Sequence, residues 1–176
     1  CLSHYGPPHH PMMKASVSHE LGHRGIVGEV CLFGGAVMEL AYNARPATKD
    51  VDALFEPTNQ IRGLAATIAD ETGLPSDWLN DGVKGFLSAN HRVEQGHLPQ
   101  FDHLRLLMPK PEYLLAMKCL ASRMGVGAGE ADDSGDIAFL IRKLQLRTLE
   151  EVFDVTTAYY PRERIPIRAK FLVESL

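Results

Sequence analysis

The sequence predicts an α+β protein, and its hydrophobic pattern supports that class in two ways. Helical and strand patterns alternate up to about residue 108, and only helical patterns remain after Pro109. With 176 residues, 45% of them hydrophobic and 23% charged, the chain is long enough to bury one core with a small appendage. We therefore expect a core over residues 12–108 and a helical C-terminal region over residues 109–176.

The N-terminal elements follow from periodicity and turn signals. Residues 1–11 are rich in His and Pro, which predicts a flexible terminus. Met13, Val17 and Leu21 recur every four residues and predict an amphipathic helix from about residue 12 to Gly25. The further expected elements are a strand at 30–33, a helix at 36–43, a strand at 50–55, a helix at 58–72 capped by Thr58, and a strand at 104–108. Residues 73–82 are rich in turn formers, and residues 88–102 are polar and predicted to be loop.

The C-terminal region is predicted to contain helices at 112–123, 137–146, 148–160 and 167–176. Thr148 and Glu151 have the spacing of a capping box, and Pro166 suits a helix start.

Composition excludes several classes of protein. The net charge of −4 argues against a surface coated with basic residues for non-specific nucleic-acid binding. No apolar run approaches the roughly 20 residues that span a bilayer, so we expect no membrane partner and a cytoplasmic location. Three cysteines, Cys1, Cys31 and Cys119, with the last two in apolar surroundings, predict free buried thiols in a reducing compartment.

One motif suggests zinc chemistry. The stretch from His19 to His23 reads HELGH and matches the H-E-x-x-H pattern of zinc metalloproteases, in which two His bind the metal and the Glu is the general base. However, Gly22 and Gly25 weaken the helix, Arg24 places a cation beside the second His, and no third ligand is evident. The alternative is a solvated polar helix face.

A second motif suggests a hard divalent metal. On a strand, Asp50 and Asp52 would share one face while Val51, Ala53 and Phe55 face the core. Two adjacent carboxylates repel each other unless a cation lies between them, and Mg²⁺ or Mn²⁺ is the usual one in nucleotidyl transfer. Alternatively, the pair is a solvated edge or the site of another metal.

Gly34 and Gly35 follow a buried strand and precede a helix. Backbone amides in such a side-chain-free turn, at a helix start, can hold the phosphates of a nucleotide. The alternative is a tight turn without a ligand. Each motif is weak by itself, but their order and spacing make the combination more specific.

Together these residues resemble a known family. Gly34-Gly35, followed after a helix by Arg45, Thr48 and Asp50-Val51-Asp52, is similar to the active-site motif of the DNA polymerase β-like nucleotidyltransferase superfamily, and more narrowly to AbiEii-type nucleotidyltransferases of toxin–antitoxin systems. The resemblance continues through WLNDGVKGF, PEYLLAMKCLASR, DSGDIAFLIRKL and YYPRERIP, over roughly residues 25–170. It implies a minimal nucleotidyltransferase fold, a small mixed sheet flanked by helices, with a C-terminal helical extension.

The resemblance also implies residue roles, and a C-terminal helical region that completes the active site of the core. Asp50 and Asp52 would bind the metal, Gly34, Gly35, Arg45 and Thr48 would bind the nucleotide, and Lys118, Arg123 and Asp136 match a later Lys, Arg and Asp of the family. Lys118 would hold the triphosphate, and Asp136 would support the metal or Lys118. From the residues alone, Lys118 either extends to water or points into a polar pocket, whereas Asp136 and Arg123 suit favourable charges at helix ends.

The implied activity is transfer of NMP from an NTP to an acceptor hydroxyl. A tRNA 3′ end is one expected acceptor, another RNA or a protein is an alternative, and a cognate antitoxin is an expected partner. Basic residues of the helical tail would contact RNA phosphates or form solvated helix faces; they are Arg142, Lys143, Arg147, Arg162, Arg164 and Arg168.

Two departures from the family pattern keep catalytic competence open. Many relatives have Gly-Ser where this chain has Gly34-Gly35. A third carboxylate, which would deprotonate the acceptor, has only poor candidates in Asp77, Asp81 and Asp102. A degenerate fold that serves as a binding or antitoxin module is therefore an alternative.

Overall fold

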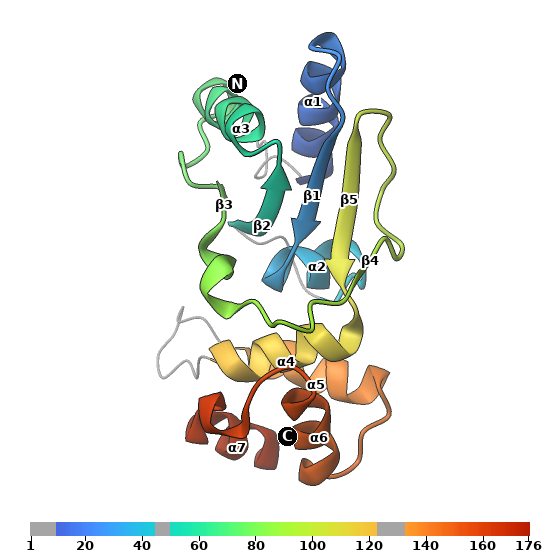
Figure 1. The fold of residues 1–176 in the computed structure, drawn as a ribbon, viewed down its shortest axis with the longest axis vertical. Coiled ribbons are helices and arrows are strands. Elements are labelled where there is room, and N and C mark those ends of the chain that lie inside the picture. The colour runs from blue at the N-terminus through green and yellow to red at the C-terminus, as the bar shows by residue number, and fades with distance from the viewer. Residues whose placement is uncertain (1–9, 45–49, 123–132) are drawn as a thin grey trace, which may run out of the picture. The chain divides into compact units, whose positions relative to one another are not determined.

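The computed structural model describes residues 10–44, 50–122 and 133–176 (Figure 1). These residues form seven α-helices and a five-stranded mixed sheet, which confirms the α+β class. They divide into two compact units, one within residues 1–83 and 95–108 and the other within residues 84–94 and 109–176. The division after Met108 coincides with the change in sequence pattern there, and the second unit also takes in residues 84–94.

The sheet contains β1 (Gly28–Leu32), β2 (Val51–Glu56), β3 (Leu79–Asn80), β4 (Val93–Glu94) and β5 (Leu104–Pro109), in the order β3-β2-β1-β5-β4. Strand β1 pairs antiparallel with β2 and parallel with β5, and β2 pairs parallel with β3. The start of β2 and the ends of β1 and β5 therefore lie at one edge of the sheet. We call this the catalytic edge, only because the sequence analysis expects the catalytic residues Asp50 and Asp52 here.

The core of the first unit is built on β1 and β2. Val51, Ala53 and Phe55 are buried at alternate positions of β2, as the sequence predicts. Helix α1 (His10–His23) contacts α3 (Thr58–Thr72). The two helices converge over Gly28, where a β-carbon would lie 2.7 Å from Leu21 Cδ1 and 3.1 Å from Ile61 Cδ1. A β-carbon at position 28 would force the ends of the Leu21 and Ile61 side chains to move, so this close approach favours glycine.

Several element boundaries differ from the expected ones. Helix α2 (Gly34–Leu40) begins at the glycine pair itself, and β2 begins at Val51, which leaves Asp50 just before the strand. The expected Thr58 cap is wrong: Pro57 is the N-cap residue of α3, and the Thr58 hydroxyl donates to the Phe55 carbonyl oxygen at 3.1 Å. The stretches expected as turn and loop contain the two-residue strands β3 and β4. Two residues are too few to produce a periodic signal.

The second unit is helical, with α4 (Pro111–Ala121), α5 (Ser134–Lys143), α6 (Leu149–Thr157) and α7 (Ile167–Glu174). Helix α4 packs against α5 and α6, and α7 packs against the same two helices. The capping box at the start of α6 is confirmed, since the Thr148 and Glu151 side chains each accept from the other's backbone amide.

Residues 84–94 are fixed to the second unit by hydrogen bonds. The Ser88 amide donates to the Tyr113 hydroxyl at 2.9 Å, and the Asn90 side-chain amide donates to the Ala158 carbonyl oxygen at 2.7 Å. The Tyr160 hydroxyl donates to the carbonyl oxygen of Phe86. These bonds span up to 74 residues of sequence, which explains why sequence patterns do not place this segment with the C-terminal helices.

Cys31 and Cys119 are free and buried, as expected, whereas Cys1 lies outside the described residues. Burial raises the pKa of Cys31 to about 12 and that of Cys119 to about 11, so both thiols stay protonated at neutral pH. None of the helices in the described part of the chain has the length and apolar character needed to span a membrane.

Candidate functional site

Gly34 and Asp52 meet at the catalytic edge. Strand β1 ends at Leu32, and the Phe33 amide donates to the Asp52 carbonyl oxygen at 2.8 Å, which aligns the glycine turn with the start of β2. Gly34 has φ +56°, and a β-carbon built on it would lie 3.2 Å from Asp52 Oδ2. The Asp52 carboxylate therefore lies directly against the glycine turn, which has no side chain to separate them.

Asp50 lies two residues before Asp52 at the same edge. It is exposed, whereas Asp52 is half-buried. The expectation that both acids belong to one strand is wrong for Asp50, because the ladder of β2 begins at Val51. Arg45 and Thr48, which the resemblance assigns to nucleotide binding, lie outside the described residues.

Asn80 is a neighbour of Asp52 that sequence reasoning missed. The two residues are directly opposite each other in the parallel pair of β2 and β3, so their side chains are on the same face. Asn80 Oδ1 accepts from the Gly82 amide at 3.0 Å, which holds the side chain in a turn. The signal in the sequence was the Asn-Asp-Gly turn, but only the pairing of β3 places it beside Asp52.

The three acids weighed for the role of third carboxylate lie in different places. Asp102 is at the opposite edge of the sheet, because β5 runs parallel to β1 and the adjacent His103 carbonyl oxygen accepts from the Gly28 amide at 2.9 Å. Asp81 forms an ion pair with Arg62 at 2.8 Å. Asp77 precedes Trp78, whose carbonyl oxygen accepts from the Val51 amide at 2.7 Å. Of the three, Asp77 has its backbone at the catalytic edge beside Asp50.

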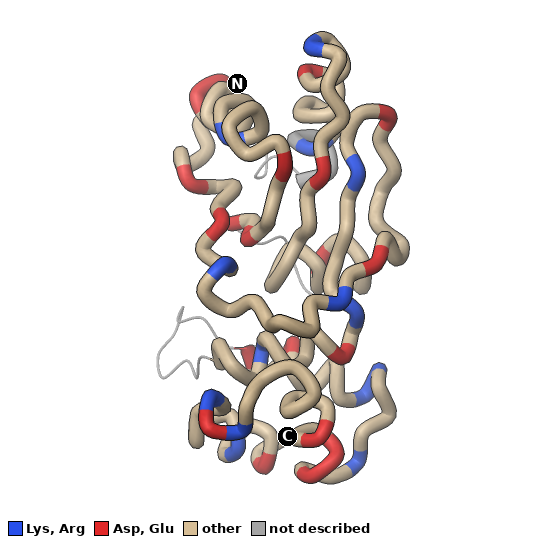
Figure 2. Tube along the Cα trace, viewed as in Figure 1, with Lys and Arg blue, Asp and Glu red and all other residues tan. Residues whose placement is uncertain are grey.

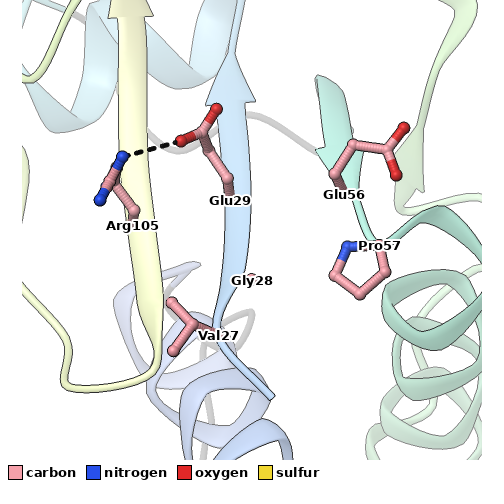
Figure 3. A pocket seen from close by; sticks show the side chains of 6 residues that line it. All are labelled: Val27, Gly28, Glu29, Glu56, Pro57 and Arg105. Atoms are coloured by element: carbon pink, nitrogen blue, oxygen red, sulfur yellow. Dashed lines mark hydrogen bonds and ion pairs between the residues drawn. The ribbon is translucent and has the colours of Figure 1, made fainter.

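A hollow of about 410 Å³ lies at the edge opposite to Gly34 (Figure 3). Glu29 and Glu56 face it from directly paired positions of β1 and β2, and Arg105 reaches Glu29 at 3.3 Å. The hollow is therefore separated from the Gly34–Asp52 contact by the length of the strands.

The donor set at the catalytic edge suits a hard cation that also has phosphate ligands. Over residues 10–44, 50–122 and 133–176, no three His, Cys, Asp or Glu side chains are grouped as metal ligands. Mg²⁺ usually takes only one or two protein carboxylates and completes its shell with water and substrate phosphate oxygens. Asp52 against the Gly34 turn, with Asp50 two residues earlier in the chain, is a donor set of that size.

The second unit contains a buried charge cluster around Lys118. The Lys118 ammonium lies 2.7 Å from Asp133 Oδ1 and 2.7 Å from Asp136 Oδ2, and all three residues are buried. Residues 113–120 of α4 are all buried, so the lysine does not extend to water. The structure thus brings Lys118 and Asp136 together, whereas Arg123 lies outside the described residues.

Asp133 is the second functional candidate that the sequence analysis missed. It is the N-cap residue of α5, but its side chain does not cap the helix; it accepts from Lys118 instead. Asp133 and Asp136 are three residues apart at the start of a helix, where side chains at i and i+3 are neighbours. A lysine buried in an apolar helix needs acidic partners, and this requirement is the signal in the sequence that points to Asp133 as well as Asp136.

The basic residues of the tail are partly engaged within the second unit. Arg168 Nε donates to the Ser122 carbonyl oxygen at 2.8 Å. The guanidinium groups of Arg162 and Arg164 lie 5.8 Å and 5.6 Å from the ring centres of Phe153 and Tyr160. Figure 2 shows acidic as well as basic segments along α6 to α7, so the tail is of mixed charge.

The HELGH motif forms the last turns of α1. His19 Nε2 and His23 Nε2 lie 3.2 Å apart, and His19 Nδ1 lies 3.7 Å from Glu20 Oε1. The His19 side chain is 71% exposed and the Glu20 side chain 49%. The motif is therefore on the protein surface, where its two imidazoles meet.

No protein-family model matches this chain, and comparisons with curated proteins and with solved structures found no significant match. The functional proposal therefore rests on the residues and their geometry.

Proposed function

We propose that the chain is a metal-dependent nucleotidyltransferase that transfers NMP from an NTP to an acceptor hydroxyl. The observation that supports it best is the contact between Gly34 and Asp52, because a carboxylate lies against a turn that no side chain fills. Asp50 and Asp52 would hold Mg²⁺ or Mn²⁺ together with the phosphates. The cation, when bound, would neutralise charge on the phosphates during transfer.

The turn at Gly34 and Gly35 would bind the phosphates through its backbone amides. Helix α2 is only seven residues long, so we assign binding to the turn itself rather than to a helix dipole. The positive φ of Gly34 and its lack of a side chain are the features that would let a phosphate approach the backbone beside Asp52. The lack of the Ser hydroxyl found in many relatives would then weaken binding without abolishing it.

By the resemblance, Lys118 would contribute a positive charge for the triphosphate. An ammonium group has three donors, and the carboxylates of Asp133 and Asp136 take two of them at 2.7 Å. The two acids would hold the amine in one orientation and leave one donor for a phosphate oxygen. They are therefore proposed as positioning residues for Lys118.

The first test is nucleotide binding. The full chain would be titrated by calorimetry with each of the four NTPs, with and without an excess of Mg²⁺ over NTP. The NTP concentrations would cover roughly the micromolar to millimolar range in which enzymes bind their substrates. We expect cation-dependent binding of at least one NTP, and loss of that binding in Asp52→Asn and Asp50→Asn. Asp70→Asn is the matched control, because Asp70 is an exposed acid on α3 of the same unit.

If Asp52→Asn bound NTP as well as the parent chain does, the metal and phosphate site would not be at the catalytic edge. That result would contradict the transferase proposal. Loss of binding in Asp70→Asn as well would show an effect of net charge rather than a site. Circular dichroism of each variant separates loss of binding from loss of fold.

The second test is group transfer. The chain would be incubated with Mg²⁺, each NTP labelled at the α-phosphate, and either total tRNA, other RNA or a cell extract of proteins. Labelled tRNA is the expected product, and treatment with a 3′-exonuclease would show whether the label is at the 3′ end. Labelled protein instead of RNA would keep the transferase chemistry and change the acceptor.

One observation favours a second candidate function, a binding or antitoxin module on a degenerate fold. Residues 107–110 at the end of β5 are Leu, Met, Pro and Lys, so the strand beside β1 brings no carboxylate to the catalytic edge. A module of this kind would bind NTP through Asp50 and Asp52 but would label no acceptor. The transfer assay therefore distinguishes the two functions when binding is intact.

A further inference from the structure

The two histidines of α1 are in direct contact with each other. His19 and His23 are one helical turn apart, and their Nε2 atoms lie 3.2 Å from each other. Two imidazole nitrogens bound to one tetrahedral zinc ion at about 2.0–2.1 Å are separated by about 3.3 Å. The two nitrogens thus already have the separation that one ion requires, and the rings, which meet edge to face at 80° with centres 4.3 Å apart, would turn to aim both nitrogens at the ion.

The surroundings of the pair form an open groove of about 500 Å³. Besides His19 and His23 it is lined by Asp102 and His103, which lie far away in sequence. The His103 amide donates to Ser18 Oγ at 3.1 Å. A β-carbon on Gly22 would lie 2.8 Å from His103 Nδ1, so the glycine between the two histidines is what allows the His103 ring to pack against α1.

We propose that His19 and His23 bind one divalent transition-metal ion of the Zn²⁺ type, with water in the remaining coordination positions. Because the structure groups no third protein ligand with the pair over the residues it describes, the site is open and its ion exchangeable. Imidazole ligands select Zn²⁺, Ni²⁺ and Cu²⁺ over Mg²⁺, so this site is chemically distinct from the carboxylate pair at the catalytic edge. The inference is independent of the proposed transferase function.

The expected consequence is that the metal stabilises α1. An ion that binds only the folded state raises the free energy of unfolding in proportion to the logarithm of its concentration above the dissociation constant. Helix α1 covers the start of β1 through Leu21, so a rise in its stability would be transmitted to the whole first unit. Zn²⁺ should therefore raise the melting temperature of the chain.

The test is calorimetric titration of the full chain with ZnCl₂, followed by thermal unfolding with and without the ion. We expect one ion per chain, and at least about a tenfold loss of affinity in His19→Ala and in His23→Ala. Asp52→Asn should leave Zn²⁺ affinity unchanged, which separates this site from the proposed Mg²⁺ site. His97→Ala is the matched control, because His97 is an exposed histidine of the same unit.

The terminal histidines need their own control. His4, His9 and His10 are close in sequence, and histidines grouped in this way can bind a metal ion without a built site. Replacement of these three by Ala should leave one zinc ion bound. If that replacement abolishes binding while His19→Ala and His23→Ala keep it, the proposal is overturned.

His103→Asn adds a second readout. A loss of affinity comparable to that of His19→Ala would show that the ring of His103 rotates into the shell and that the site has three protein ligands. An unchanged affinity supports the two-histidine site. Unchanged zinc affinity in both His19→Ala and His23→Ala, with the fold retained by circular dichroism, would contradict the inference outright.

Discussion

Gly34 and Asp52 approach each other so closely that a β-carbon on the glycine would lie 3.2 Å from the aspartate Oδ2. We therefore expect Gly34→Ala to lower stability by about 1–2 kcal/mol, because an alanine at φ +56° is in the left-handed region. The added methyl group would also occupy the space proposed for a phosphate. Urea unfolding measures the first effect, and calorimetric titration with NTP and Mg²⁺ measures the second.

Gly63→Ala is the matched control for that substitution. Gly63 is inside α3, and a β-carbon there would have no neighbour within 4 Å. Alanine should therefore stabilise the helix by about 0.4–1 kcal/mol and leave nucleotide binding unchanged. If Gly34→Ala behaved like Gly63→Ala in both measurements, the turn would have neither the strain nor the function that we assign to it.

The sequence predicts the Gly34–Asp52 contact because both residues follow from local patterns. A glycine pair after a buried strand and alternating burial on the next strand are short-range signals, and the antiparallel pairing of two consecutive strands brings them together. By contrast, Asn80 reaches Asp52 through a two-residue strand that has no periodicity of its own. Asp133 reaches Lys118 across a stretch that contains residues outside the described part of the chain.

The HELGH motif shows the same limit in another way. The sequence places the two histidines one turn apart, which helix geometry alone ensures, but it gives no reason to expect His103 beside them. That contact depends on β5 pairing with β1, which positions the segment before β5 against α1. Contacts between distant segments depend on the topology, which a single sequence does not supply.

Lys118→Met should be strongly destabilising. The lysine is 8% exposed and balances two carboxylates that are 5% and 6% exposed, so its removal takes away the positive charge that offsets two buried negative ones. Loss of one member of a buried ion pair costs about 3–5 kcal/mol. Asp133→Asn should cost less, on the order of 1–2 kcal/mol, because Asp136 still neutralises the lysine. Chemical unfolding of both variants gives the comparison.

The triple variant Lys118→Met/Asp133→Asn/Asp136→Asn provides the decisive control. It removes all three charges, and we expect it to recover part of the stability that Lys118→Met loses, since uncharged side chains have a smaller cost of burial. If the triple variant were less stable than Lys118→Met, the cluster would contribute net stability. Stability alone would then explain why these three charged residues are present in the interior.

Because Lys14 is buried, we expect its contribution to the free energy of unfolding to rise as the pH becomes alkaline. Its side chain is 4% exposed, its amine has no hydrogen-bond partner among the residues that the structure describes, and burial lowers its pKa to about 8 from 10.5 despite the nearby Glu39 carboxylate. Below pH 8 both the folded and the unfolded chain are protonated at this site. Between about pH 8 and 10.5 only the unfolded chain binds the proton, so this contribution to the free energy of unfolding rises with pH.

Lys14→Met isolates that contribution from the opposing effect of the two buried thiols. At pH 7 the variant should be more stable than the parent by about 1–3 kcal/mol, because a buried charge is removed. The difference should shrink through the window from pH 8 to 10.5 and be absent above it. A difference that stays constant over that window, in urea unfolding at a series of pH values, would show that the amine is solvated or paired.

Thr148 and Glu151 fix the start of α6, and their capping box predicts that part of the stability of the protein is lost in acid. Thr148→Ala should cost about 1 kcal/mol, because Thr148 Oγ1 accepts from the Glu151 amide at 3.2 Å. The Arg147 and Thr148 amides, which donate to the Glu151 carboxylate, lower the pKa of that group. Its capping contribution is therefore complete above the ordinary pKa of 4.5 and is lost as the pH falls through the lowered pKa.

Glu151→Gln should abolish this acid dependence. Thr157→Ala, which changes an exposed hydroxyl at the other end of α6, should alter stability by less than about 0.5 kcal/mol. Thermal unfolding of the three variants between pH 3 and 7 would check these expectations, and an unchanged acid dependence in Glu151→Gln would assign it to another carboxylate.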